Sequence, residues 1–264
     1  MRLLTLNGAT YALGGMLVLR NTLALAALAG AASIGGRAMR RLGAAGRLTR
    51  ASRPYSVTPR HAAGSLLIVG DSTALGTGAS TAEASLAGRI ARRYPALAIR
   101  TVARAGARFE AIAEQLRQAG RHDVILIAGG ANDVMRFTSR ERLAGAIELT
   151  LARAASQAAK VIVVPAPNVG NAPFFPPPLS WLLSRRARAL HTLVRASAAA
   201  NGAAYVDLYR ERAEDPFARD PQRLIAVDHL HPSDAGYAVW FDEIERQAPL
   251  SHCVPDLHAK RDRG

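Results

Sequence analysis

Short apolar runs alternate with segments of helical periodicity from residue 65 onward. Five runs have the length and composition of buried strands: residues 65–69, 96–103, 123–128, 161–164 and 202–208. Helical patterns occupy residues 79–94, 108–120, 139–159 and 233–246. This alternation predicts an α/β domain over residues 65–248, with an open, mostly parallel five-stranded sheet and helices on both faces. In such sheets the ligand binds at the carboxyl ends of the strands.

The amino-terminal segment, residues 1–41, has a different pattern. Two apolar stretches, 3–19 and 22–36, are separated by Arg20 and Asn21. Neither stretch reaches the roughly 20 residues that a membrane span needs. A secretory signal, a membrane anchor and an interfacial helix all remain open for this segment. We expect it to associate with a membrane or to direct export, and the side of the membrane is not determined.

Charge separates this segment from the rest of the chain. The net charge is +14, and residues 1–61 contain nine arginines and no acidic residue. The remainder is mildly basic, has few aromatic residues and carries no nucleic-acid-binding motif, which argues against a nucleic-acid partner. The single cysteine, Cys253, excludes an internal disulfide and a cysteine-based zinc site. Residues 42–64 are predicted to be a linker, and residues 249–264 a disordered tail.

A candidate nucleophile follows the first predicted strand. Gly70, Asp71 and Ser72 lie at a strand-to-helix turn, where a hydroxyl is exposed and backbone N–H groups face developing negative charge. These residue types are also ordinary turn formers, so the turn alone does not establish chemistry. Asp71 is expected to steady the turn by a hydrogen bond.

A candidate base lies just before the last helix. A carboxylate three residues ahead of a histidine can fold back onto the ring Nδ1 and leave Nε2 free to face a serine, and Asp228 and His231 have this spacing. His229, between them, is expected to point away. The alternative is that Asp228 and His231 merely cap the following helix. A metal site is not indicated, because no third ligand at a recognisable spacing accompanies the pair, and no cofactor is expected.

An oxyanion formed on an acyl carbon needs pre-oriented N–H donors. The candidates are the backbone N–H groups of Ser72 and Gly106 and the side-chain amide of Asn132. As an alternative, Gly106 serves only a tight turn and Asn132 only a helix cap. However, these elements and His231 follow one another at separate strand ends, where one pocket would collect them.

In these blocks the sequence resembles the SGNH hydrolases, or GDSL-type esterases and lipases. The matching blocks are Gly70-Asp71-Ser72, Gly106, residues 130–133 (Gly-Ala-Asn-Asp) and residues 228–231 (Asp-His-Leu-His). The resemblance covers residues 65–248 and implies a flavodoxin-like three-layer α/β/α sandwich. It also implies catalytic roles for Ser72, Asp228 and His231, and an oxyanion hole made by Ser72, Gly106 and Asn132. Thr73 departs from the usual Leu or Tyr after the serine, which leaves the subfamily open.

The function expected from these residues is hydrolysis of carboxylic esters through an acyl-Ser72 intermediate, with lipid-like or simple acyl esters as substrates. An acyltransferase or a carbohydrate deacetylase would use the same residues, and a membrane-tethered binding protein would keep the fold without turnover. The apolar segment at residues 165–178 is longer than an ordinary connection. It is expected to line an acyl pocket, to touch a bilayer or to pack back on the domain. The oligomeric state is not determined by the sequence.

Overall fold

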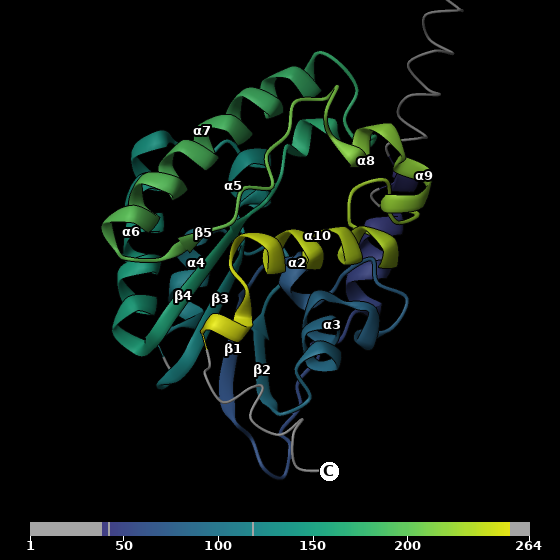
Figure 1. Ribbon diagram of the computed structural model, residues 1–264. Coiled ribbons are helices and arrows are strands. Elements are labelled where there is room, and N and C mark those ends of the chain that lie inside the picture. The colour runs from purple at the N-terminus through teal and green to yellow at the C-terminus, as the bar shows by residue number, and fades with distance from the viewer. Residues whose placement is uncertain (1–38, 42, 118, 254–264) are drawn as a thin grey trace, which may run out of the picture. The chain divides into compact units, whose positions relative to one another are not determined.

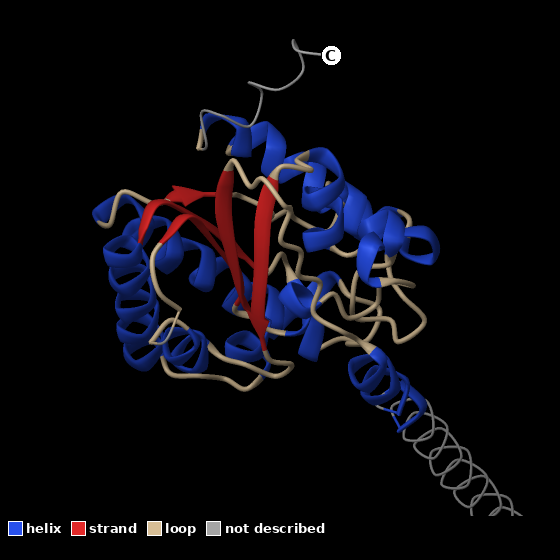
Figure 2. Ribbon diagram, turned by 90° about the horizontal axis from the view of Figure 1, so that it is seen from below, coloured by secondary structure: helices blue, strands red, loops and turns tan. Residues whose placement is uncertain are grey.

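The computed structural model describes residues 39–41, 43–117 and 119–253. Its sheet has five strands in the order β2-β1-β3-β4-β5, and every pair is parallel (Figures 1 and 2). The strands are β1 (Gly64–Gly70), β2 (Leu97–Ala103), β3 (His122–Gly129), β4 (Ala158–Pro165) and β5 (Ala204–Tyr205). The predicted α/β/α sandwich with a five-stranded parallel sheet is therefore confirmed.

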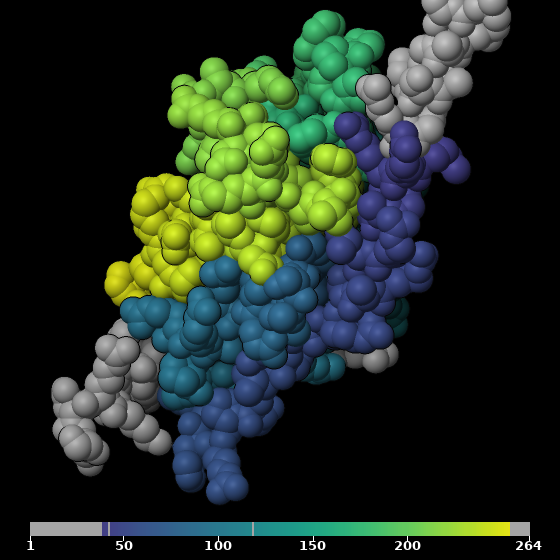
Figure 3. All heavy atoms as spheres, turned by 90° about the vertical axis from the view of Figure 1, so that its right-hand side faces the viewer, coloured from purple at the N-terminus to yellow at the C-terminus, as the bar shows by residue number. Residues whose placement is uncertain are grey.

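Helices cover both faces of the sheet, which explains why the central strands are apolar without interruption. On one face, Leu66 and Ile68 of β1 pack in a cluster with α3 (Leu86–Arg93) and α10 (Asp234–Gln247). On the other, Leu67 and Val69 pack in a cluster with α4, α6 and α7. These three helices span Phe109–Gln115, Arg140–Gln157 and Leu179–Ala200. Figure 3 shows the side on which the yellow and yellow-green C-terminal elements lie against the blue atoms around α3.

Four short helices lie near the predicted site residues. They are α2 (Ser72–Leu75) after β1, α5 (Ala131–Met135) after β3, and α8 (Pro216–Arg219) and α9 (Pro221–Leu224) before the last loop. Three 3₁₀ turns complete the fold: η1 (Ala82–Ala84), η2 (Val169–Asn171) and η3 (Leu250–His252). β2 lies on one side of β1, and the next strand of the chain, β3, lies on the other side. The strand order therefore reverses beside β1. The carboxyl ends of β1 and β3 therefore lie where open parallel sheets generally bind ligands.

Two predicted elements differ in extent. The strand expected at residues 202–208 is reduced to β5, an edge strand that pairs with β4 at only two positions. The helix expected over residues 79–94 is divided, because Ser85 is extended and its Oγ accepts a hydrogen bond from the N–H of Gly88 as the N-cap of α3.

The structure also bears on the linker and the tail that were predicted from composition. Residues 1–38 lie outside the described part, so the predicted signal or anchor is not tested. Residues 43–51 of the expected linker are helical, and Val57 forms an isolated antiparallel bridge with Ile99. Leu250, in the expected tail, is fully buried. None of the helices in the described ranges has the length and apolar character that a membrane crossing requires.

Candidate active site

The turn after β1 fixes the position of Ser72. The Asp71 side chain is the N-cap of α2, and its Oδ1 accepts hydrogen bonds from the Thr73 N–H at 2.9 Å and the Thr73 hydroxyl at 2.8 Å. Gly70 is required here, because a Cβ at this position would lie 1.9 Å from the carbonyl oxygen of Ala128. The expected task of Asp71 in steadying the turn is confirmed.

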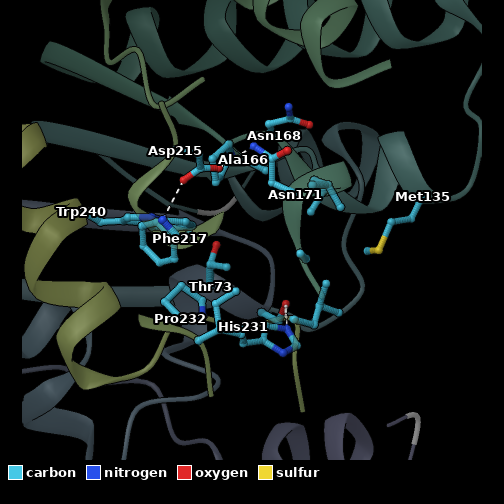
Figure 4. Close-up of a pocket in the computed structure, with 17 residues that line it drawn as sticks. Thr73, Met135, Ala166, Asn168, Asn171, Asp215, Phe217, His231, Pro232 and Trp240 are labelled. Atoms are coloured by element: carbon cyan, nitrogen blue, oxygen red, sulfur yellow. Dashed lines mark hydrogen bonds between the residues drawn. The ribbon is translucent and has the colours of Figure 1, made fainter. Parts of the chain in front are cut away.

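Ser72, His231 and Asp228 form a continuous series of hydrogen bonds. The Ser72 Oγ lies 2.9 Å from His231 Nε2, and His231 Nδ1 lies 2.5 Å from Asp228 Oδ2 (Figure 4 shows His231). With the proton on Nδ1 donated to Asp228, Nε2 is left as the acceptor for the serine hydroxyl. All three side chains are buried, and Asp228 is fully so. Sequence spacing predicted the Asp228–His231 contact, whereas the approach of Ser72 across 159 residues comes from the fold.

Asp228 is held as a carboxylate by its surroundings. Burial by itself would raise the pKa of Asp228, but the side-chain hydrogen bond and the charge of His231 and the N–H groups of His231 and Leu230 together lower it. Its negative charge is therefore available to stabilise a proton on His231. His229 is exposed and adopts a left-handed φ of 64°, which turns it away as expected.

A second buried network supports Asn132. Its Nδ2 lies 3.5 Å from Asp71 Oδ2, the outer limit of a hydrogen bond. The neighbouring Asp133 accepts from the Phe109 N–H at 2.9 Å and from the Thr138 hydroxyl at 3.0 Å. Burial raises the pKa of both Asp71 and Asp133. Because an amide has two N–H groups, Asn132 keeps a donor for another acceptor.

Gly106 lies in the turn after β2, with a left-handed φ of 76°. A Cβ added there would meet Nη2 of Arg136 at 3.2 Å. Within the described chain, the backbone N–H groups of Ser72 and Gly106 donate to no protein acceptor. No hydrogen bond in that part of the chain links Gly106 to the other four predicted site residues.

A cavity of about 80 Å³ opens beside Ser72 and His231 (Figure 4). Its lining is mainly apolar and comes from α2, α5, the segment after β4 and the residues around α8 and α10: Thr73, Ala131, Met135, Ala166, Pro167, Val169, Ala172, Phe217, Ile225, Leu230, Pro232 and Trp240. The long segment after β4 thus contributes to the lining of the cavity. This agrees with the first of the three alternatives predicted for it, that it lines a pocket.

These observations agree with the comparison to known families. The model of the GDSL-like lipase/acylhydrolase family matches residues 68–239. The chain belongs to this family. Membership makes it a carboxylic ester hydrolase, and the resemblance in the sequence blocks is confirmed. No curated protein matches the chain.

Solved structures with the same fold include several enzymes. LAE5, an α/β hydrolase from the metagenome of Lake Arreo in Spain, is 19% identical, with a TM-score of 0.57 over 73% of this chain and 97% of its own. TesA is 18% identical, with a TM-score of 0.56 over 72% of this chain and 99% of its own. Axe2, an acetylxylan esterase from Geobacillus stearothermophilus, is 19% identical, with a TM-score of 0.51 over 70% and 94%.

Three polar residues lining the acylhydrolase cavity escaped the sequence analysis: Asn168, Asn171 and Asp215. Asp215 accepts from Asn171 Nδ2 at 2.7 Å and from the Phe217 N–H at 2.9 Å, and burial raises its pKa. Asn168 Oδ1 is buried and has no partner in the described chain. The only signal for Asp215 was its place before Pro216, typical of a helix start.

A metal centre finds no support in the described ranges of the acylhydrolase. They contain no group of three or more His, Cys, Asp or Glu side chains placed to hold an ion.

Proposed function

We propose that this chain hydrolyses esters through an acyl-enzyme on Ser72. The Ser72 Oγ attacks the acyl carbon while its proton passes to His231 Nε2, and Asp228 stabilises the resulting imidazolium. His231 then protonates the departing alcohol. Water attacks the acyl-serine, gives a proton to His231, and the acid leaves as Ser72 regains its hydrogen. The observation that carries this proposal is the series of hydrogen bonds from Ser72 through His231 to Asp228.

The negative charge on the carbonyl oxygen needs donors in both steps. We assign this role to the backbone N–H groups of Ser72 and Gly106 and to the Asn132 amide. The support is that neither N–H is used by the described chain and that Asn132 retains a donor. Each such donor contributes about 10²- to 10³-fold to turnover in comparable sites.

The cavity favours a short acyl group. A volume of about 80 Å³ beside Ser72 suits a few non-hydrogen atoms, and its apolar wall suits a small alkyl group. Axe2, an acetylxylan esterase, has the same fold. We therefore favour simple acyl esters over long-chain lipid esters. The same residues would also support acyl transfer to an alcohol, which product analysis distinguishes.

An active-site-directed phosphonate tests the mechanism. Intact mass measurement of the full chain is expected to show one adduct, lost in Ser72→Ala and strongly reduced in His231→Ala. Ser197→Ala is the matched control, because Ser197 is as buried as Ser72. A series of p-nitrophenyl esters from acetate to decanoate then tests chain length. A folded wild type that takes no label would refute the activated serine.

A further inference from the structure

Exposed apolar side chains gather at the start of α7. The described chain exposes seven large apolar side chains: Met39, Phe137, Leu149, Leu179, Trp181, Leu182 and Val227. Three of them lie in the first turn of α7, with 38% of Leu179, 69% of Trp181 and 46% of Leu182 exposed. Such clustering is unusual on a soluble domain and indicates a surface that meets a partner.

Phe137, two residues after the end of α5, extends this cluster. The Arg186 guanidinium lies 5.1 Å above the centre of the Phe137 ring, and it also donates to the carbonyl oxygens of Val134 and Thr138. Arg186 follows Leu182 by one helical turn, so the two share a face of α7. Phe137 is 46% exposed and has a left-handed φ of 54°, which non-glycine residues rarely adopt. We call Phe137, Leu179, Trp181 and Leu182 the α7 patch.

The α7 patch lies at the same edge of the sheet as Ser72. A helix that follows a parallel strand begins at the carboxyl edge, and α7 follows β4 as α5 follows β3 (Figure 1). Met135, two residues before Phe137, lines the Ser72 cavity. Trp181 lines a neighbouring groove of about 660 Å³ that shares Asn168 and Asn171 with that cavity. A partner seated on the patch would therefore face the proposed active site.

Charge identifies the kind of partner. The two segments that carry the patch, residues 134–140 and 179–188, contain five arginines and no acidic residue. Among the residues that the structure describes, Arg136, Arg140 and Arg185 have no ion pair or hydrogen bond from the guanidinium, whereas Arg188 pairs with Glu211. Apolar side chains beside unpaired arginines complement a surface that is apolar inside and anionic outside. A symmetric pair of copies would instead place arginines against arginines.

We propose that the α7 patch docks the domain on an anionic lipid bilayer. The Trp181, Leu182 and Phe137 side chains enter the boundary between headgroups and acyl chains, and Arg136, Arg140 and Arg185 contact lipid phosphates. Docking turns the edge that carries Ser72 toward the membrane surface. This inference does not depend on catalysis by Ser72, since it rests only on the surface around α5 and α7.

The fluorescence of Trp181 in the full chain tests the proposal directly. The chain has two tryptophans, and Trp240 is only 5% exposed. Phosphatidylglycerol vesicles with brominated acyl chains are expected to quench the Trp181 emission, and brominated phosphatidylcholine vesicles much less. In Trp181→Phe the residual emission of Trp240 is expected to stay unquenched. Total binding to vesicles is recorded only to show that the chain is on the vesicles, because the segment at residues 1–41 is expected to contribute to it.

Variants test the apolar side chains and the arginines of this surface separately. Leu182→Glu is expected to abolish the quenching, whereas Leu149→Glu on α6, with 44% exposure, is the matched control. Arg185→Gln should raise the vesicle concentration needed for half-maximal Trp181 quenching about five-fold, since each arginine near an anionic surface contributes roughly that factor. Arg92→Gln on α3 is the charge control. It removes the same charge far from the α7 patch in the sequence and should leave the quenching of Trp181 unchanged.

Three results would overturn the proposal. The first is unquenched Trp181 on vesicles that nevertheless bind the chain. The second is equal quenching in Leu182→Glu and Leu149→Glu. The third is a concentration-dependent dimer in ultracentrifugation that Leu182→Glu abolishes while Trp181 stays unquenched, which would assign the patch to a second copy.

Discussion

Replacement of Asp228 by asparagine separates proton positioning from folding. Asp228 accepts three hydrogen bonds, from His231 Nδ1 at 2.5 Å and from the N–H groups of Leu230 and His231 at 3.0 Å each. In Asp228→Asn the remaining Oδ1 can keep the two backbone bonds, so the loop is expected to retain its shape. The new Nδ2 then faces His231 Nδ1, which must become an acceptor, and the ring proton moves to Nε2. His231 can no longer accept the proton of Ser72.

The expected loss of kcat is about 10³- to 10⁴-fold, or roughly 4–5.5 kcal/mol in activation free energy. KM should change little, because Asp228 does not line the Ser72 cavity. The free energy of unfolding should fall by about 1–3 kcal/mol for the altered buried network. Steady-state hydrolysis of p-nitrophenyl acetate and urea unfolding measure the two effects separately.

Asp220→Asn is the matched control. Asp220 also accepts a backbone N–H three residues ahead, that of Arg223, but it lies at the start of α9 with a half-exposed side chain. Its replacement is expected to leave kcat unchanged. If folded Asp228→Asn kept more than about a tenth of the wild-type kcat while Ser72→Ala had none, the assigned orienting role of Asp228 would be refuted.

Three further predictions concern the surroundings of the site. Asn132→Ala should lower kcat about 10²- to 10³-fold in the same assay while Asn201→Ala does not, and an unchanged rate would remove Asn132 from the oxyanion hole. Phe217→Ala enlarges the cavity and should move the best substrate in the p-nitrophenyl ester series toward longer chains, by about four-fold in kcat/KM per added methylene; an unmoved optimum would place the acyl group elsewhere. Burial raises the pKa of Asp133 in the folded state, so the charge of this carboxylate lowers the free energy of unfolding at neutral pH. This destabilisation disappears as the pH falls toward the ordinary pKa of an aspartate. Unfolding measurements should therefore show the stability of the wild type rising relative to Asp133→Asn between pH 7 and about 4, and a fall would contradict the burial effect.

The sequence by itself determined the local parts of this protein. The apolar runs at residues 123–128 and 161–164 must be buried on both faces, which specifies a covered parallel sheet. The spacing of Asp228 and His231 determines their contact, because three residues of chain suffice to join them. The order of Gly70, Asp71 and Ser72 likewise determines a capped turn, since Asp71 needs only Thr73 to make its hydrogen bonds.

Tertiary structure decided what no short spacing could carry. Ser72 meets His231 because β1 ends at the same sheet edge as the loop before α10, although 159 residues separate them. Asp215 and Asn171 are 44 residues apart and belong to the cavity only through the packing of η2 and α8. The α7 patch was visible as apolar residues in the sequence, but their exposure depends on which face of α7 the sheet covers. Sequence thus predicts contacts made within a turn or a strand, whereas contacts between distant elements follow from the way the sheet brings its strand ends together.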